Sequence, residues 1–199
     1  MKKFIFILVS LFLAVGGFSN FAYADANDFT VESFDAHYYL SKDSEGRAVL
    51  KVVEEITAIF PNFDQNHGIE RAIPKKYQGH ISYRDDLLVY RNGEAENIAS
   101  AKDDSGNKVY RIGNSREYVH GRQVYRLEYS FRDVMRSDLF EDSQTLIWNV
   151  NGTQWKQNFG RVSATIFIDK NLFSDLKNYD CYYGVYGSKN KCGLITERD

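Results

Sequence analysis

Apolar and polar side chains alternate with a period of two along much of the chain, which is typical of β-strands with one buried face. The alternation is clear in residues 34–40 and again in Ala48–Phe60, and a polar, glycine-containing turn at 42–46 separates the two segments. The spacing predicts that they pair as an antiparallel hairpin. Glu54 falls on the more apolar face of the second segment, where a carboxylate is unusual.

Shorter segments of the same kind follow. Pro61 ends the second strand because proline has no backbone N–H to donate, and residues 66–74 are interpreted as irregular with small apolar anchors. Asn92-Gly93 predicts a tight hairpin turn. Residues 134–141 fit a short helix or a loop, and 172–176 fit one helical turn. We expect short strands at 87–90, 96–100, 108–112, 123–131, 145–150 and 160–168.

The pattern therefore predicts an all-β fold, an antiparallel β-sandwich of about 7–9 strands. Both tryptophans of the chain, Trp148 and Trp155, lie in one stretch with a glycine between them. Since each indole can bury roughly 150–250 Å², this stretch is expected to organise the core. The prediction is a strand over 145–150, a turn at Gly152, and a return of Trp155 to the core.

The N-terminus has a different character. A basic start, an uncharged apolar run from Phe4 to Phe18 and the sequence Ala22-Tyr23-Ala24 match the three regions of a secretory signal peptide. We expect residues 1–24 to be the signal peptide and 25–199 to form one extracytoplasmic domain at the cell envelope. An uncleaved membrane anchor is the alternative, although the run is shorter than the ~18 apolar residues that spanning requires.

The charge balance and the cysteines indicate which classes of partner to expect and whether the cysteines are bonded. Without Lys2 and Lys3, the 25 basic residues fall to 23 against 27 acidic ones, a net charge of −4. This balance predicts no nucleic-acid partner and no polybasic membrane contact. Cys181 and Cys192 are expected to form a disulfide, because an exported chain meets oxidising conditions. A metal-binding or redox pair is the alternative, but there is no CxxC spacing and no nearby histidine.

Four ordered blocks resemble one family. They are His67-Gly68-Ile69-Glu70-Arg71-Ala72-Ile73-Pro74, then Tyr110-Arg111-Ile112-Gly113 with Tyr118, Gly121 and Tyr125, then Trp148-Asn149-Val150 with Gly152 and Trp155, and finally the segment from Cys181 to Ser188 followed by Cys192. Together they resemble the DUF2207 group of predicted bacterial membrane proteins.

The resemblance implies an N-terminal extracytoplasmic β-sandwich that is normally followed by transmembrane helices. The chain ends at Asp199, where that continuation would begin, so we expect either an excised domain or a naturally short member, with membrane association if the full chain continues. The family has no established biochemical activity. The resemblance therefore implies architecture and supplies no chemistry.

Candidate chemistry is sparse. A buried Glu54 would have a raised pKa and could act as a general acid, but glycosidase chemistry needs two converging carboxyls. The structural alternatives for Glu54 are an exposed strand rim or pairing with an arginine. The four histidines, His37, His67, His80 and His120, form no metal-binding spacing, and His67 is expected to organise a turn. We predict no catalytic residue, no cofactor and no metal.

Arg71 is the exception among the charged residues, because Ile69 and Ile73 on either side of it are expected to enter the core. Its guanidinium is expected to fork onto a carboxylate, either Glu54 or Asp35, in a structural role. The alternative is that it faces a carboxylate or phosphate ligand.

The leading hypothesis is a non-catalytic recognition or assembly domain at the bacterial cell envelope. Its ligand would be a protein, a peptide along an exposed edge strand, or a glycan stacked on tyrosine. A carboxylate-dependent envelope glycan hydrolase is the second hypothesis. A structural ectodomain that supports a membrane partner is the third.

Overall fold

A computed structural model describes residues 28–76, 82–137, 143–174, 176–185 and 187–193. Across these ranges the chain is built from strands, with one short helix, α1 (Lys170–Phe173), so the prediction of an all-β fold is confirmed. The predicted signal peptide and part of the 134–141 segment lie outside the described residues. The strands are β1 (Thr30–Lys42), β2 (Ala48–Phe60), β3 (Gly68–Pro74), β4 (Ser82–Tyr83), β5 (Leu88–Arg91), β6 (Glu94–Ala95), β7 (Ile98–Asp104), β8 (Asn107–Gly113), β9 (Gly121–Arg132), β10 (Phe159–Ile168), β11 (Tyr182–Tyr183) and β12 (Asn190–Lys191).

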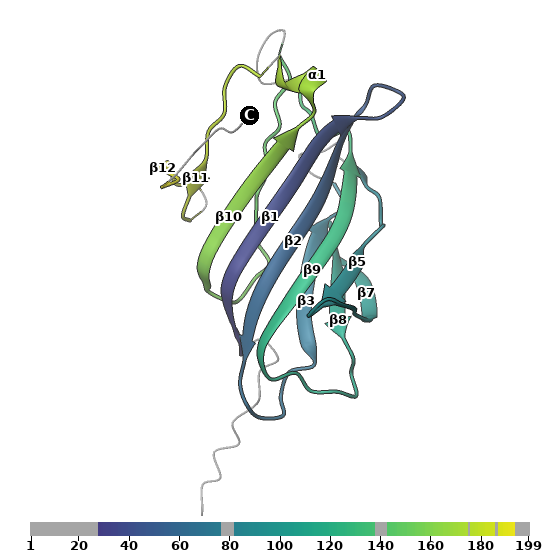
Figure 1. Ribbon diagram of the computed structural model, residues 1–199, viewed down its shortest axis with the longest axis vertical. Helices are drawn as coiled ribbons and strands as arrows, with labels where there is room; N and C mark the ends of the chain where they lie inside the picture. The colour runs from purple at the N-terminus through teal and green to yellow at the C-terminus, as the bar shows by residue number, and fades with distance from the viewer. Residues whose placement is uncertain (1–27, 77–81, 138–142, 175, 186, 194–199) are drawn as a thin grey trace, which may run out of the picture.

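The larger sheet has the strand order β10-β1-β2-β9-β5-β6, with β4 also paired to β9 (Figure 1). The hairpin of β1 and β2 forms as predicted, and Asp43 closes it through a hydrogen bond from its N–H to the Arg47 carbonyl at 2.9 Å. β10 pairs with β1 in parallel, which differs from the expected antiparallel arrangement. Side-chain alternation has the same period in both arrangements, so the sequence pattern carries no information on strand direction.

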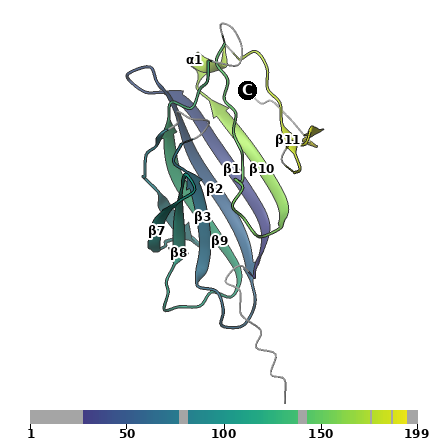
Figure 2. The same cartoon turned by 180° about the vertical axis from the view of Figure 1, so that it is seen from behind.

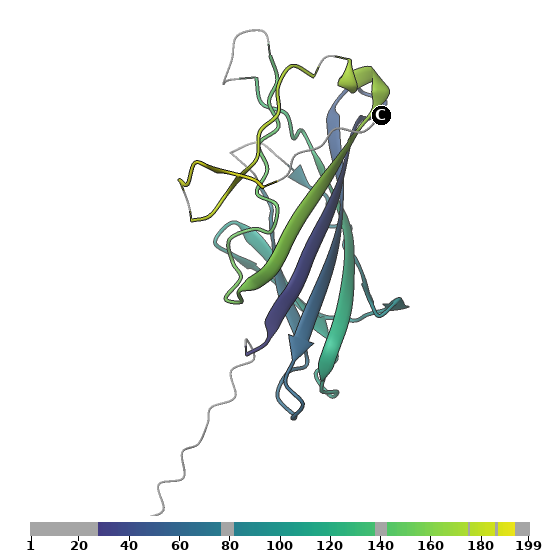
Figure 3. The same cartoon turned by 60° about the vertical axis from the view of Figure 1, so that its left-hand side comes forward.

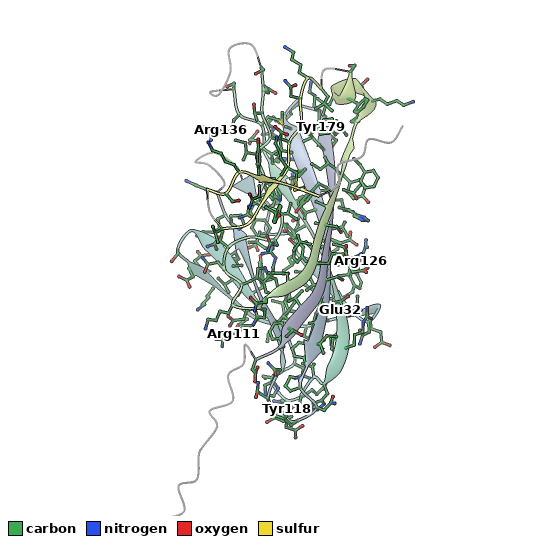
Figure 4. All side chains as sticks on the ribbon, turned by 90° about the vertical axis from the view of Figure 1, so that its left-hand side faces the viewer. Glu32, Arg111, Tyr118, Arg126, Arg136 and Tyr179 are labelled. Carbon is green, nitrogen blue, oxygen red and sulfur yellow. A yellow bond between two sulfur atoms is a disulfide. The ribbon has the colours of Figure 1, made fainter. Side chains whose placement is uncertain are left out.

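The smaller sheet has the order β3-β8-β7 and lies behind the large sheet in Figure 1, so it faces the viewer in Figure 2. Seen from the side, Arg111 of β8 and Arg126 of β9 point away from each other on opposite outer surfaces, with a layer of packed side chains between the sheets (Figure 4). Apolar residues of both sheets make one core, including Phe34, Ile73 and Tyr125. The two layers thus form the predicted sandwich.

Two predictions about the small sheet were wrong. Residues 68–74 form β3 and not an irregular segment, because Ile69, Arg71 and Ile73 alternate inward and an arginine in the middle position hides the period of two. A strand was expected at 96–100 across the Asn92-Gly93 turn from 87–90, but the partner of β5 is β6, and residues 98–100 belong to β7. The chain then crosses to the other sheet, where Ile98 opposes Ile112.

The tryptophan segment does not form the predicted strand at 145–150. Its only ladder contact among the described residues is a single bridge between Arg136 and Thr145. Side chains bind its backbone instead: Tyr38 Oη donates to the Val150 carbonyl at 3.0 Å, and Trp155 Nε1 donates to the Asn151 carbonyl at 2.7 Å. Such local bonds compete with a sheet ladder, which explains the irregular course.

This segment packs on the inner face of β1, beside Arg71 of the small sheet. Trp148 packs against Tyr38 and Phe131, and Trp155 against Phe34. Both indoles are half-buried, so they lie along the edge of the core and are not enclosed by the two sheets as expected. Gly152 makes the predicted turn with a φ of 78°.

Candidate functional site

A buried ion pair joins the two sheets of the sandwich. Arg71 of β3 donates from Nε to Glu54 Oε2 at 2.8 Å and from Nη2 to Glu54 Oε1 at 2.5 Å. Both side chains are almost inaccessible, with exposures of 3% and 1%. The predicted pairing of Arg71 with Glu54 is therefore confirmed, while Asp35 instead binds Arg161 of β10 at 2.9 Å.

Tyr129 of β9 completes this cluster, which we call the buried Glu54–Arg71–Tyr129 cluster. Its hydroxyl donates to Glu54 Oε1 at 2.5 Å. Burial and the Glu54 charge raise the pKa of Tyr129 well above its usual value. Burial lowers the pKa of Arg71, but the charge and hydrogen bonds of Glu54, together with the nearby Tyr129 and Tyr38, raise it by more, so the guanidinium stays charged. A charged, fully bonded pair with a neutral phenol is the stable state of the cluster.

Aromatic rings and the tryptophan segment enclose the guanidinium. Its Cζ lies 5.7 Å from the ring centroids of both Phe34 and Trp155, within the range of a cation–π contact. A Cβ placed on Gly152 would come within 2.9 Å of Arg71 Nη1, so the close approach of this turn requires glycine. Pro74 and Asn149 lie nearby, on the wall of a cavity of about 140 Å³ beside Arg71.

This arrangement does not meet the requirements of the glycan hydrolase hypothesis. Glu54 is already engaged by Arg71 and Tyr129, and the residues that line the cavity include no second carboxylate. Both retaining and inverting glycosidases need two opposed carboxyls. The volume is also below the range of about 300–1,000 Å³ that is usual for ligand pockets. We interpret the cluster as a device that fixes the distance and register of the two sheets.

The remaining signature residues hold loops. His67 Nδ1 lies 2.7 Å from the Glu117 carbonyl, and its ring stacks on Tyr118 with centroids 4.4 Å apart. Gly68 at the start of β3 opposes Gly113 at the end of β8, and a Cβ on either would lie 1.9 Å from a backbone oxygen of the opposite segment. His67 therefore contacts the loop that contains Glu117 and Tyr118, and its role in organising a turn stays a prediction.

The cysteines form the expected disulfide, Cys181–Cys192, which closes the small β11–β12 hairpin. Within the described ranges, no three residues among His, Cys, Asp and Glu gather closely enough to hold a metal ion. The prediction of no metal and no cofactor stays a prediction.

A second feature is the exposed β10 edge, which faces the viewer in Figure 4. On the outer face, Phe167 stacks on Tyr39 with centroids 4.8 Å apart, and His37 meets Phe167 edge-on at 5.9 Å. Phe167 is 46% exposed although it is a large apolar side chain. The rings of His37, Tyr39 and Phe167 thus form an aromatic group on the outer face, next to the charged Asp35 and Arg161.

The inner face of β10 is also uncovered. Val162 and Ile166 lie in register with the buried Phe34 and Tyr38 of β1, so they face the core side, yet they are 43% and 51% exposed. Within the described part of the chain, no strand pairs with the free side of β10. The sheet therefore ends in a ten-residue strand that is apolar on its inner face and unpaired along one side.

The sequence did not single out this surface. It predicted a strand at 160–168 with Val162, Ala164, Ile166 and Ile168 in register, which fits a buried inner strand equally well. The exposure results from the order of strands, which places β10 at the end of the sheet. Strand order depends on contacts that are distant in sequence, so alternation alone gives no signal for it.

Similarity to solved structures is weak. One is a leukotriene A4 hydrolase from Saccharomyces cerevisiae, with 12% identity, a TM-score of 0.33, and coverage of 52% of this chain and 15% of that one. Another is an M1 zinc metallopeptidase variant from Deinococcus radiodurans bound to a Tyr-Ser-Ala substrate, with 15% identity, a TM-score of 0.33, and coverage of 70% and 32%. The chain thus spans under a third of these proteins, and the likeness carries no argument about activity.

No curated protein matches the chain. In the part of the chain that the structure describes, no helix has the length and apolar character needed to cross a bilayer. A family model does match, over residues 30–180, and it is described as the N-terminal domain of a predicted membrane protein, DUF2207. It spans β1 through β10 and the tryptophan segment, and the chain belongs to this family.

Proposed function

We propose that this chain is an extracytoplasmic recognition and assembly domain of a membrane protein, and that it binds a protein partner along the β10 edge. The observation that supports the proposal is the unpaired side of β10 with exposed apolar residues on its inner face. An added strand would satisfy the free backbone groups of β10, and apolar side chains of the partner would cover Val162 and Ile166.

The alternative sheet edges are less suitable for strand addition. β7 carries Lys102, Asp103 and Asp104, β3 ends in Pro74, and β6 has two residues. Charges, proline and short length are the features by which proteins prevent pairing at their edges. β10 has none of these apart from Arg161, whose charge is paired with Asp35.

Site-specific cross-linking in the source cells tests the proposal. A photoreactive benzoylphenylalanine at Ile166 should give a discrete protein adduct, whereas the same group at Ile98, which is also exposed but lies on the charged β7 edge, should not. Equal labelling from both positions, or none from Ile166, would overturn the proposal.

A further inference from the structure

We propose that the protein that pairs with β10 is a second copy of this chain, joined antiparallel in a register centred on Ala164, so that the two large sheets become one. The inference rests on the proposed function of the β10 edge and names its partner. A two-fold axis through this position places residue 162 opposite 166, 163 opposite 165 and 161 opposite 167.

This register is self-complementary in side-chain chemistry. Val162 and Ile166 of one copy would face Ile166 and Val162 of the other on the inner side, which covers the apolar side chains that are exposed in the single chain. Such directly opposed pairs of β-branched residues stabilise antiparallel strands. Ser163 would oppose Thr165 on the outer side, where hydroxyl pairs are compatible.

The charge pattern agrees with the same register. Arg161 is the one charged residue of β10, and it would lie opposite Phe167 of the second copy and not opposite another Arg161. A guanidinium beside an aromatic ring is attractive. Since like charges directly opposed would be repulsive, the centring on Ala164 avoids the one unfavourable pair that the strand offers.

The backbone is oriented for this pairing. In the β1–β2 hairpin, the Asp43 N–H donates to the Arg47 carbonyl. The backbone N–H and C=O groups of the odd-numbered residues of β1 from Ser33 onward therefore point to β2, and those of the even-numbered residues point to β10. The Asp169 N–H correspondingly donates to the Leu40 carbonyl at 3.0 Å. By alternation, the N–H and C=O groups of Val162, Ala164 and Ile166 point to the free side, as a hydrogen-bonded pair at the two-fold axis requires.

The β11–β12 hairpin, drawn in yellow, is a neighbour of the β10 edge. It lies beyond the free side of β10 in Figure 1 and toward the inner side of the large sheet in the side views (Figures 3 and 4). Its strands form their own two-stranded sheet and share no ladder with β10.

Disulfide trapping tests the register. Opposed residues in a hydrogen-bonded antiparallel pair have Cα atoms about 5.5 Å apart, which is within disulfide range. Because Cys181 and Cys192 are already bonded to each other, Ala164→Cys introduces a single free thiol. On mild oxidation Ala164→Cys should form a disulfide-linked dimer, and Ser163→Cys should form much less, because residue 163 opposes 165.

Sedimentation of the secreted chain measures the association itself. Ile166→Lys should weaken self-association by at least about tenfold, corresponding to roughly 1.4 kcal/mol, while Ile98→Lys should leave it unchanged. Both residues are exposed in the single chain, so folding is preserved. A monomer at all concentrations, or dimerisation that Ile166→Lys does not affect, would overturn the inference.

The identity of the adduct from the benzoylphenylalanine at Ile166 separates the two proposals. An adduct with twice the mass of the chain and only its peptides supports self-pairing. An adduct with a different protein would overturn self-pairing while leaving the β10 edge as the recognition surface. Absence of any adduct would overturn both.

Discussion

Burying the charge of Glu54 or of Arg71 alone would carry a large desolvation cost, which their mutual ion pair offsets. Taking one partner away leaves an uncompensated charge in the core, which typically destabilises a protein by about 3–5 kcal/mol. The apolar rings of Phe34 and Trp155 on the guanidinium offer no alternative acceptor. The burial of Glu54 in the large sheet therefore depends on Arg71 in the small sheet, and the burial of Arg71 depends on Glu54.

We expect Glu54→Gln to lower the free energy of unfolding by about 3–5 kcal/mol, because Arg71 then stays charged without a counter-ion. Replacing both partners, with Glu54→Leu and Arg71→Met, should restore much of this loss, since two apolar side chains carry no desolvation cost. Urea unfolding of the single and double variants measures the coupling.

The matched control is Glu70→Gln, which breaks the exposed Arg111–Glu70 pair at 2.7 Å between β3 and β8. Exposed pairs contribute about 0–1 kcal/mol. If Glu54→Gln costs no more than Glu70→Gln, or if the double variant loses the sum of the two single effects, the interpretation of the buried cluster is wrong.

Among the elements, the start of the small sheet depends on two opposed glycines. Gly68 has a φ of 142° and Gly113 one of 134°, and a Cβ on either would overlap the backbone of the other strand. The positive φ and the backbone overlap affect the same two residues. A larger side chain at either position would force β3 and β8 apart next to Ile69, which enters the core.

We therefore expect Gly68→Ala to destabilise the domain by about 2 kcal/mol or more, in line with strained positive-φ positions. Gly106→Ala is the control, because this glycine has a φ of 83° in the β7–β8 turn but open space around it. Thermal unfolding of both variants separates the steric cost from the conformational one. Equal shifts in the two would show that close approach at Gly68 is unimportant.

The sequence predicted elements better than it predicted their assembly. The bounds of β2 and the inward faces of β2 and β9 follow from alternation over many residues. β3 was missed because its middle inward position is Arg71, whose burial depends on Glu54 in the other sheet. The parallel pairing of β10 and its place at the edge depend on contacts more than a hundred residues apart, which local patterns do not encode.

β10 is joined to β1 by an electrostatic contact as well as by the ladder. Asp35 accepts hydrogen bonds from Ser163 and from Arg161, the latter at 2.9 Å. Partial burial raises the pKa of Asp35, but these hydrogen bonds and the Arg161 charge lower it by more, so it lies below its usual value. Ionised Asp35 is thus favoured in the folded chain relative to the unfolded one.

This shift sets a direction for the pH dependence. A carboxyl with a depressed folded pKa contributes stability above its unfolded pKa of about 3.9 and loses that contribution as the pH falls through the folded value. We expect Asp35→Asn to flatten the acid side of the stability curve, measured by urea unfolding between roughly pH 6 and pH 3. Asp28→Asn, at an exposed position before β1, is the control and should leave the slope unchanged.

At the scale of the whole molecule, the chain divides into a cross-connected sandwich and a peripheral hairpin. The sandwich is held by one core shared between two sheets, whereas all four residues of β11 and β12 are exposed. The disulfide lies within the hairpin, and the Cys192 N–H donates to the Cys181 carbonyl at 3.0 Å. The covalent bond therefore stabilises a part of the chain that the core does not.

Reduction of Cys181–Cys192 should accordingly open the hairpin and leave the sandwich folded. Loop closure of this size corresponds to about 2–3 kcal/mol, but that contribution reaches global stability only if hairpin and core unfold together. We expect a small fall in Tm, an unchanged far-UV circular dichroism spectrum, and loss of hydrogen-exchange protection at the Cys192 N–H. Loss of the whole sheet signal on reduction would show instead that the hairpin supports the sandwich, and an unchanged mass after thiol alkylation would show that reduction had not occurred.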